Sequence, residues 1–179
     1  MKKLQAIKTL RVWDKAGKYV FTKHQLCKLF PQDLPKTFNE GLKRLVKDNI
    51  LVRACRGIYI NPQATSLDSY TIEHIAKALR PGEYNYVSLE SILSEYGAIS
   101  QIPPDRITVV TTGRKGVYQT PYGTIEYTHT KRDWSDILKG IVTVEKRPLR
   151  IASKATAWRD LKRVGRNINM VNLEALNED

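Results

Sequence analysis

The side chains with the clearest chemical potential lie between residues 35 and 48, where apolar residues recur at helical spacing. That spacing leaves a polar face made of Lys36, Thr37, Asn39, Glu40, Lys43 and Lys47. Asn bonds adenine through a paired donor and acceptor, Lys approaches guanine, and Thr contacts a base edge or a thymine methyl group. The pattern predicts base reading by Lys36, Thr37, Asn39 and Lys43, with Lys47 on the phosphate backbone. The alternative is an ordinary solvated helix face.

Two arginines flank the tip of an expected hairpin directly after this helix. Residues 50–60 hold two apolar stretches around Ala54–Gly57, and Gly57 suits the backbone angles of a tight turn. Such a hairpin can follow the sugar-phosphate backbone or enter the minor groove, where Arg is favoured. Arg53 and Arg56 are therefore predicted DNA contacts, and the alternative is that they are surface arginines on a solvated turn.

A second basic set lies near the C-terminus, on a helix that Ser153 is expected to cap and that buries Ala155, Trp158 and Leu161. Its members are Lys154, Arg159, Lys162, Arg163 and Arg166. They predict a second surface that binds phosphate groups. The alternative, equally open, is a solvated helix with paired charges, such as Asp160 with Arg163.

Signatures of catalysis and of metal binding are missing. The sequence has none of the motifs of zinc proteases, P-loops or serine hydrolases. The segment 112–116, TGRKG, resembles a phosphate loop only superficially, and we expect a hairpin turn there. His24, His74 and His129 show no metal-ligand spacing with each other or with Cys27 and Cys55. We therefore expect a protein that is not an enzyme and needs no cofactor or metal.

The elements that must position these side chains form two parts. Three helices followed by a hairpin, within residues 1–62, is the order of a winged helix-turn-helix. Residues 61–69 are polar, and we interpret them as a linker. Residues 70–179 predict helices, then strands from Arg106 onward, and a final helix. The predicted fold class is α+β: an N-terminal winged helix-turn-helix (1–62) followed by a small α+β domain with an antiparallel sheet (70–179).

Charge narrows the choice of partner. The 179 residues are 41% hydrophobic and 27% charged, which excludes disordered, collagen-like and membrane-spanning chains. The net charge is +12, and residues 1–62 hold 14 basic against four acidic side chains. This asymmetry favours a polyanionic partner, most often nucleic acid. The two cysteines and the absence of a signal-peptide pattern favour a cytoplasmic protein.

Several runs of the sequence resemble AbiEi-type antitoxins of bacterial type IV toxin–antitoxin (abortive-infection) systems. They are YVSLESILSEYGAISQIPPDRITVVTTGR, TPYGTIEYTHTKR, FTKHQLCKLF and RGIYINP. The resemblance covers roughly residues 5–155. It implies an N-terminal winged helix that binds inverted repeats in its own promoter and represses the operon. It further implies a C-terminal antitoxin domain (70–179) that counteracts a nucleotidyltransferase-like toxin without a stable complex, as a phage defence.

We therefore expect a cytoplasmic DNA-binding autorepressor and antitoxin that acts on double-stranded DNA as a monomer or weak dimer. The basic set at Lys154–Arg166 is then either an antitoxin surface or a second nucleic-acid face. One alternative is an RNA-binding winged-helix module that grips folded RNA by shape and phosphates. Another is a nucleic-acid-processing enzyme.

Overall fold

The computed structural model describes residues 2–100 and 105–177, and the chain divides into two compact units, Met1–Leu79 and Arg80–Asp179. We call them unit 1 and unit 2. This division falls later than the expected domains, 1–62 and 70–179, because helix α4 (Thr71–Leu79) packs against strands β1 and β3 of unit 1. The final residues 178 and 179 of the predicted second domain lie outside the described part.

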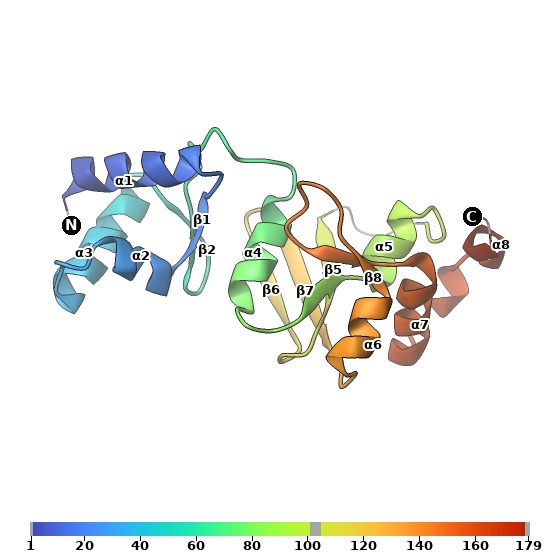
Figure 1. Ribbon diagram of the computed structural model, residues 1–179. Helices are drawn as coiled ribbons and strands as arrows, with labels where there is room; N and C mark the ends of the chain where they lie inside the picture. The colour runs from blue at the N-terminus through green and yellow to red at the C-terminus, as the bar shows by residue number, and fades with distance from the viewer. Residues whose placement is uncertain (1, 101–104, 178–179) are drawn as a thin grey trace. The chain divides into compact units, whose positions relative to one another are not determined.

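Unit 1 contains the expected order of three helices and a hairpin, followed by α4 (Figure 1). A short strand between the first two helices is an addition that the sequence analysis missed. It pairs with β3, which gives an antiparallel three-stranded sheet in the order β1-β3-β2. The bounds are α1 (Lys3–Lys15), β1 (Val20–Thr22), α2 (Lys23–Leu29), α3 (Pro35–Lys47), β2 (Val52–Cys55) and β3 (Ile58–Ile60).

Local signals explain where α2 and α3 begin. The Thr22 side chain accepts a hydrogen bond from the backbone N–H of Gln25, whose side chain accepts one from the Thr22 N–H. The sequence offers Thr22 as the cap of a short second helix, and this reciprocal capping box confirms it. Pro35 occupies the first turn of α3, where a missing N–H has no cost.

The core of unit 1 collects the apolar faces of α1, α2 and α3 against the sheet. Its members are Ala6, Leu10, Phe21, Leu26, Phe30, Phe38, Leu42, Leu45, Leu51 and Tyr59. Apolar residues at helical spacing predict Leu26, Leu29 and Phe30 as the buried face of α2, and all three lie in this core or pack against it. For α1, the helical spacing of Leu4, Ile7, Leu10 and Trp13 predicts one buried face, which is wrong in part because Leu4 is 66% exposed and Trp13 is 36% exposed. Steps of three residues drift about 60° around a helix, so Leu4 and Trp13 lie on opposite sides.

Unit 2 is built on a six-stranded sheet in the order β6-β7-β5-β4-β9-β8. Pairs β5–β7 and β4–β9 are parallel, and the other pairs are antiparallel. The α+β class is confirmed, but the predicted small antiparallel sheet is wrong, since the sheet is larger and mixed. The strands are β4 (Asn85–Val87), β5 (Arg106–Thr111), β6 (Gly116–Thr120), β7 (Gly123–His129), β8 (Ile141–Val142) and β9 (Arg150–Ala152).

The path from β5 to β6 corrects a second prediction. Strand β7 lies between β5 and β6, so residues 112–115 carry the chain past β7 and are not a hairpin turn. Of these three strands, the consecutive pair β6 and β7 forms the hairpin. Alternation along a strand predicts the strand itself but not its neighbour, which is why the crossing escaped the sequence analysis.

The helices of unit 2 are α5 (Leu89–Glu95), α6 (Trp134–Lys139), α7 (Lys154–Val164) and α8 (Leu173–Asn177), with a short 3₁₀ turn at Ile168–Met170. Helix α5 packs against α7 and β5. Ser153 caps α7 as predicted, through the Thr156 N–H. Among the described residues, no helix is long and apolar enough to cross a membrane.

The buried face of α7 differs from the predicted one. Its fully buried positions are Thr156, Ala157, Asp160 and Leu161, whereas Ala155 is exposed and Trp158 is half-buried. The three-residue steps from Ala155 to Leu161 drift around the helix in the same way as those of α1. One consequence is that a carboxylate, Asp160, lies in the core of unit 2.

Candidate nucleic-acid interface

A groove of about 980 Å³ runs between the polar face of α3, the β2–β3 hairpin and the start of α2. Both the helix face and the hairpin arginines of the sequence analysis line it. Its charged and amide side chains are Lys23, Lys36, Asn39, Glu40, Lys43, Arg53 and Arg56. The structure thus brings α3 and the hairpin, 10 to 20 residues apart in sequence, onto one surface.

Helix α3 presents this face because its opposite side is held by the core. Phe38, Leu42 and Leu45 are 2–4% exposed. Residues three, four or seven positions apart share one side of a helix, so Lys36, Asn39 and Lys43 align along the groove. The two lysines are exposed and Asn39 is half-buried.

Three features shape the hairpin and fix its tip. Gly57 has a φ of +83°, which a side chain would disfavour, and it closes the turn after Arg56. The Gly57 carbonyl accepts a hydrogen bond of 2.7 Å from the Lys23 N–H at the start of α2. A register shift between Arg53 and Cys55 adds a bulge to β2. These features leave Arg53 and Arg56 exposed beside α3.

Not every predicted contact reaches the groove. Lys36, Asn39, Lys43, Arg53 and Arg56 line it, whereas Thr37 and Lys47 do not. Thr37 is exposed but lies about 100° around the helix from Lys36. Lys47 is exposed at the last position of α3, beyond the end of the groove.

Lys23 is the groove cation that the sequence analysis missed. Its only sequence signal is its place directly after the Thr22 cap, at the first position of α2. That position becomes informative only once β1 pairs with β3, because this pairing carries the start of α2 to the hairpin tip.

The electrostatics of the groove favour an anionic partner. Unit 1 holds 15 Lys and Arg side chains against six Asp and Glu, a net formal charge of +9. Among the described residues that line the groove, the one acid is Glu40, which pairs with Lys43 at 3.0 Å. Both side chains are more than half exposed, and such surface pairs are worth little. Lys43 therefore remains available to a stronger anionic partner.

The acids of unit 1 outside the groove are held by their own neighbours. Lys3 pairs with Asp48 at 2.8 Å, and its hydrogen bond and charge hold the pKa of Asp48 below the ordinary value. Asp14 accepts hydrogen bonds from Thr65 and Ser66. These contacts keep negative charge on side chains that do not line the groove.

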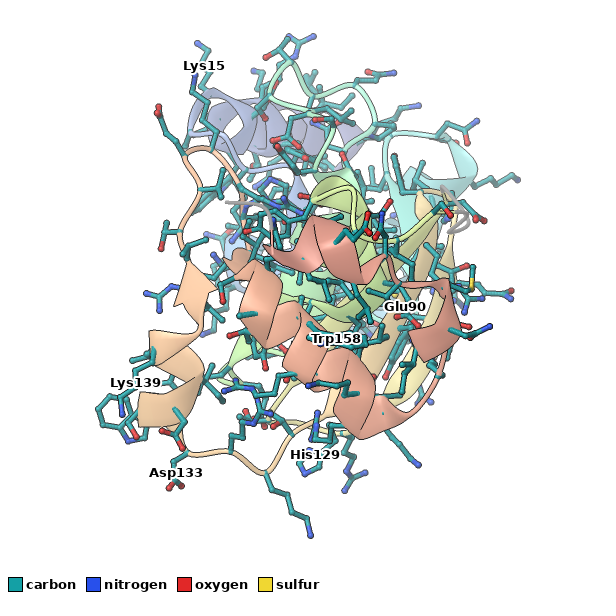
Figure 2. The ribbon with its side chains drawn as sticks, turned by 90° about the vertical axis from the view of Figure 1, so that its right-hand side faces the viewer. Lys15, Glu90, His129, Asp133, Lys139 and Trp158 are labelled. Atoms are coloured by element: carbon teal, nitrogen blue, oxygen red, sulfur yellow. The ribbon has the colours of Figure 1, made fainter. Side chains whose placement is uncertain are left out.

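The second basic set, on and after α7, is mostly engaged within unit 2. Arg166 bonds both carboxylate oxygens of Glu90, at 2.7 and 3.1 Å, and also bonds Glu126. Burial lowers the pKa of Arg166, but the bonds to the two carboxylates outweigh it and leave the pKa raised. Figure 2 labels Glu90, which comes from α5, and Trp158, which comes from α7.

The other members of this set differ in their engagement. Lys154 donates to the Ala175 carbonyl at 3.1 Å, and Arg163 donates to the His129 carbonyl at 3.2 Å. Lys162 lies over the Trp158 ring, 5.2 Å from its centre. Arg159 is exposed and has no partner within the described part of the chain.

The pairing of Asp160 with Arg163, the alternative in the sequence analysis, is wrong. Asp160 is fully buried and pairs with Arg132 at 2.8 Å, and it accepts hydrogen bonds from Tyr86 and Ser88. Ser88 also does not cap α5, as its hydroxyl serves Asp160 instead. The carboxylate is thus the centre of a satisfied polar network that joins α7 to β4.

Histidine and cysteine form no reactive cluster in residues 2–100 and 105–177. No group of three or more His, Cys, Asp or Glu side chains there could hold a metal ion. Cys27 is exposed and Cys55 is half-buried. Burial raises the pKa of the Cys55 thiol, against a smaller opposite effect of Arg53, which disfavours a reactive thiolate.

Comparison with known proteins adds little. No protein-family model matches the sequence, and no curated protein matches it. The chain is similar to a solved structure, the RV2827C protein from Mycobacterium tuberculosis, with 15% identity and a TM-score of 0.46. The match covers 72% of this chain and 45% of that one, so the likeness spans less than half of that protein.

Proposed function

We propose that unit 1 is a winged helix-turn-helix that binds double-stranded DNA, with α3 in the major groove and the β2–β3 hairpin as the wing. The observation that carries the proposal is the basic groove, in which the polar face of α3 and the hairpin arginines meet. Helix α3 has 13 residues and is about 20 Å long. A major groove about 12 Å wide admits a helix of this kind.

The side chains of the groove divide into those proposed to contact bases and those proposed to contact the phosphate backbone. Lys36, Asn39 and Lys43 lie along the first three turns of α3, where a recognition helix reaches base edges. Asn39 matches adenine and the lysines match guanine. Arg53, Arg56 and Lys23 would hold the phosphate backbone or the minor groove beside it.

Duplex DNA fits this surface better than RNA does. The deep, narrow major groove of A-form RNA excludes a helix, and single-stranded RNA is bound chiefly by stacking on exposed aromatic side chains. Tyr59 is the aromatic residue that lines the groove, and it is 8% exposed. A stacking platform is therefore missing from the described lining.

We extend the proposal to regulation of transcription in the cytoplasm, on the strength of the resemblance to AbiEi-type antitoxins. The protein would repress its own operon by binding inverted repeats, as a monomer or weak dimer on DNA. An antitoxin activity of unit 2 rests on that resemblance alone. Binding and not catalysis is the proposed activity of both units.

Footprinting of the full chain on the DNA upstream of its own gene tests the proposal. We expect protection of two similar half-sites, with a competing RNA hairpin of the same sequence displacing little protein. Asn39→Ala should remove the protection of specific bases, whereas Thr37→Ala serves as a matched control on the flank of α3. Stronger binding to the RNA hairpin than to the DNA would overturn the proposal.

A further inference from the structure

Unit 2 contains its own hollow, of about 1250 Å³, beside the loop 112–116. Arg114, Lys115 and the two flanking glycines line it, together with His129 at the end of β7 and Arg166 after α7. This segment is the one that the sequence analysis set aside as a hairpin turn. Since it is a crossing loop, its lysine, arginine and glycines need another explanation.

Two hydrogen bonds to its carbonyls fix the orientation of the peptide groups in this loop. The Gly113 carbonyl accepts a hydrogen bond of 2.8 Å from His129 Nδ1, and the Arg114 carbonyl accepts one of 3.1 Å from Arg80. In a trans peptide the N–H points opposite to the carbonyl. The N–H groups of Arg114 and Lys115 therefore point away from His129 and Arg80.

These two amides have no acceptor among residues 2–100 and 105–177. Arg114 and Lys115 each combine such an amide with a cationic side chain, and backbone N–H groups and cations are the groups that bind phosphate oxygens. Gly113 permits the close packing beneath the loop, because an added Cβ would lie 3.1 Å from the Glu83 side chain.

The two acids that line the hollow both have partners of their own. Glu83 accepts a 2.6 Å hydrogen bond from the Thr112 hydroxyl, and Glu126 is bonded by Arg106 and Arg166. The exposed side chains of Arg114 and Lys115 have no acidic partner within the described chain. A bound anion would supply the missing charge.

The place of the loop in the sheet supports the same conclusion. Thr111 and His129 are paired at the carboxyl ends of the parallel strands β5 and β7. Ligands of open sheets bind in the crevice beyond the carboxyl ends of parallel strands. Arg163 adds a further cation there through its bond to the His129 carbonyl.

We propose that this hollow binds a phosphate group, with the Arg114 and Lys115 amides and side chains as its ligands. Exposed Val117 and the half-buried Val164 provide an apolar wall for the sugar or base that carries the phosphate. A mononucleotide and a nucleic-acid backbone share this chemistry. The site belongs to unit 2 and does not depend on DNA binding by unit 1.

The test is an amide NMR titration of the ¹⁵N-labelled full chain in about 50 mM salt, where screening is moderate. One arm uses AMP, which carries a phosphomonoester, and the other uses a thymidine dinucleotide whose single phosphate is an internal diester. Saturable shifts of the Arg114, Lys115 and His129 amides with either probe support the proposal. A response to AMP alone identifies a free nucleotide, and a response to the dinucleotide identifies a backbone.

The variant R114Q/K115Q should weaken binding roughly tenfold, because it removes two charge-assisted contacts. Both side chains are exposed, so the remaining spectrum should be unchanged. K139Q is the matched control, since it removes a charge from α6, which Figure 2 shows apart from His129. The proposal is overturned if no amide of the loop shifts up to about 10 mM probe, or if K139Q weakens binding as much as R114Q/K115Q does.

Discussion

The α3–hairpin groove of unit 1 and the α7 region of unit 2 are both rich in lysine and arginine, yet the structure uses them differently. In the groove, five predicted contacts and Lys23 face outward, with one weak surface pair. Around α7, Arg166, Arg163 and Lys154 are bonded to carboxylates or carbonyls of their own unit. A basic helix face therefore predicts an anionic partner only where the fold supplies no partner first.

The distribution of acids causes this difference. Unit 2 holds 15 basic and 12 acidic side chains, against 15 and six in unit 1. The α5–α7 side of unit 2 buries Glu90 and Asp160, which require cations nearby. Unit 1 has fewer acidic side chains that need a cation nearby, so the cations of its groove remain available to an external ligand.

The largest expected effect is that of salt on DNA affinity. Each neutralised phosphate gives a slope of about −0.9 in log K against log salt. Six to eight contacts from unit 1 would lower the affinity by about 10³–10⁴-fold between 50 and 200 mM salt. Fluorescence anisotropy with a labelled duplex measures this slope. A nearly flat dependence would mean that the cations of unit 1 do not bind DNA phosphates, so that the groove would not differ from the α7 region in this respect.

The second prediction concerns the stability of unit 2. Asp160→Asn leaves Arg132 without its buried carboxylate, so we expect a loss of roughly 3 kcal/mol in the free energy of unfolding. Urea denaturation measures the loss. Arg159→Gln removes an exposed charge from the same helix and should change stability by less than about 0.5 kcal/mol. Equal effects of the two variants would refute the structural role of the α7 network.

A third prediction separates base recognition from phosphate binding within the groove. Asn39→Ala should cost roughly 1–3 kcal/mol against the specific site and little against random DNA. Arg53→Ala, which removes a backbone anchor that lines the groove, should weaken both kinds of DNA about equally. The measurement is a pair of binding curves, one for each DNA. If Asn39→Ala weakens all DNA alike, α3 does not read bases.

The smallest effect concerns acid stability at Asp14. Hydrogen bonds from the Ser66 side chain and from the Thr65 and Ser66 amides lower the pKa of Asp14 to about 2. Its contribution to stability is therefore present above about pH 4 and is lost as the pH falls towards 2. The difference in Tm between the natural chain and Asp14→Ala should shrink over that range, and a constant difference would contradict this role.

Much of unit 1 could be predicted from the sequence because its signals are local. Thr22, Pro35 and Gly57 act on neighbouring residues, and the apolar face of α3 repeats at helical spacing. Strand β1 has three residues, too few to show alternation. The sheet of unit 2 was missed for a different reason, since its order depends on pairings between distant strands.

The candidate site was predictable where one element carries it and not where two elements meet. Lys36, Asn39 and Lys43 share a helix face, and their spacing shows it. Lys23 lies beside them because its backbone N–H bonds the Gly57 carbonyl, which no local pattern indicates. Thr37 does not line the groove because it is turned about 100° around the helix from Lys36. For α7, the sequence shows the cations but not the buried carboxylates that hold them.

The central claim is that the groove, and not the overall positive charge, binds DNA. Its most direct test compares two variants of the full chain, each with three cations of unit 1 replaced by Gln. One lacks Lys36, Lys43 and Arg56 of the groove, and the other lacks the exposed Lys8, Arg11 and Lys15 of α1. We predict that the salt slope becomes shallower by about 2.7 for the groove variant and stays unchanged for the α1 variant. An equal change in both slopes would contradict the account.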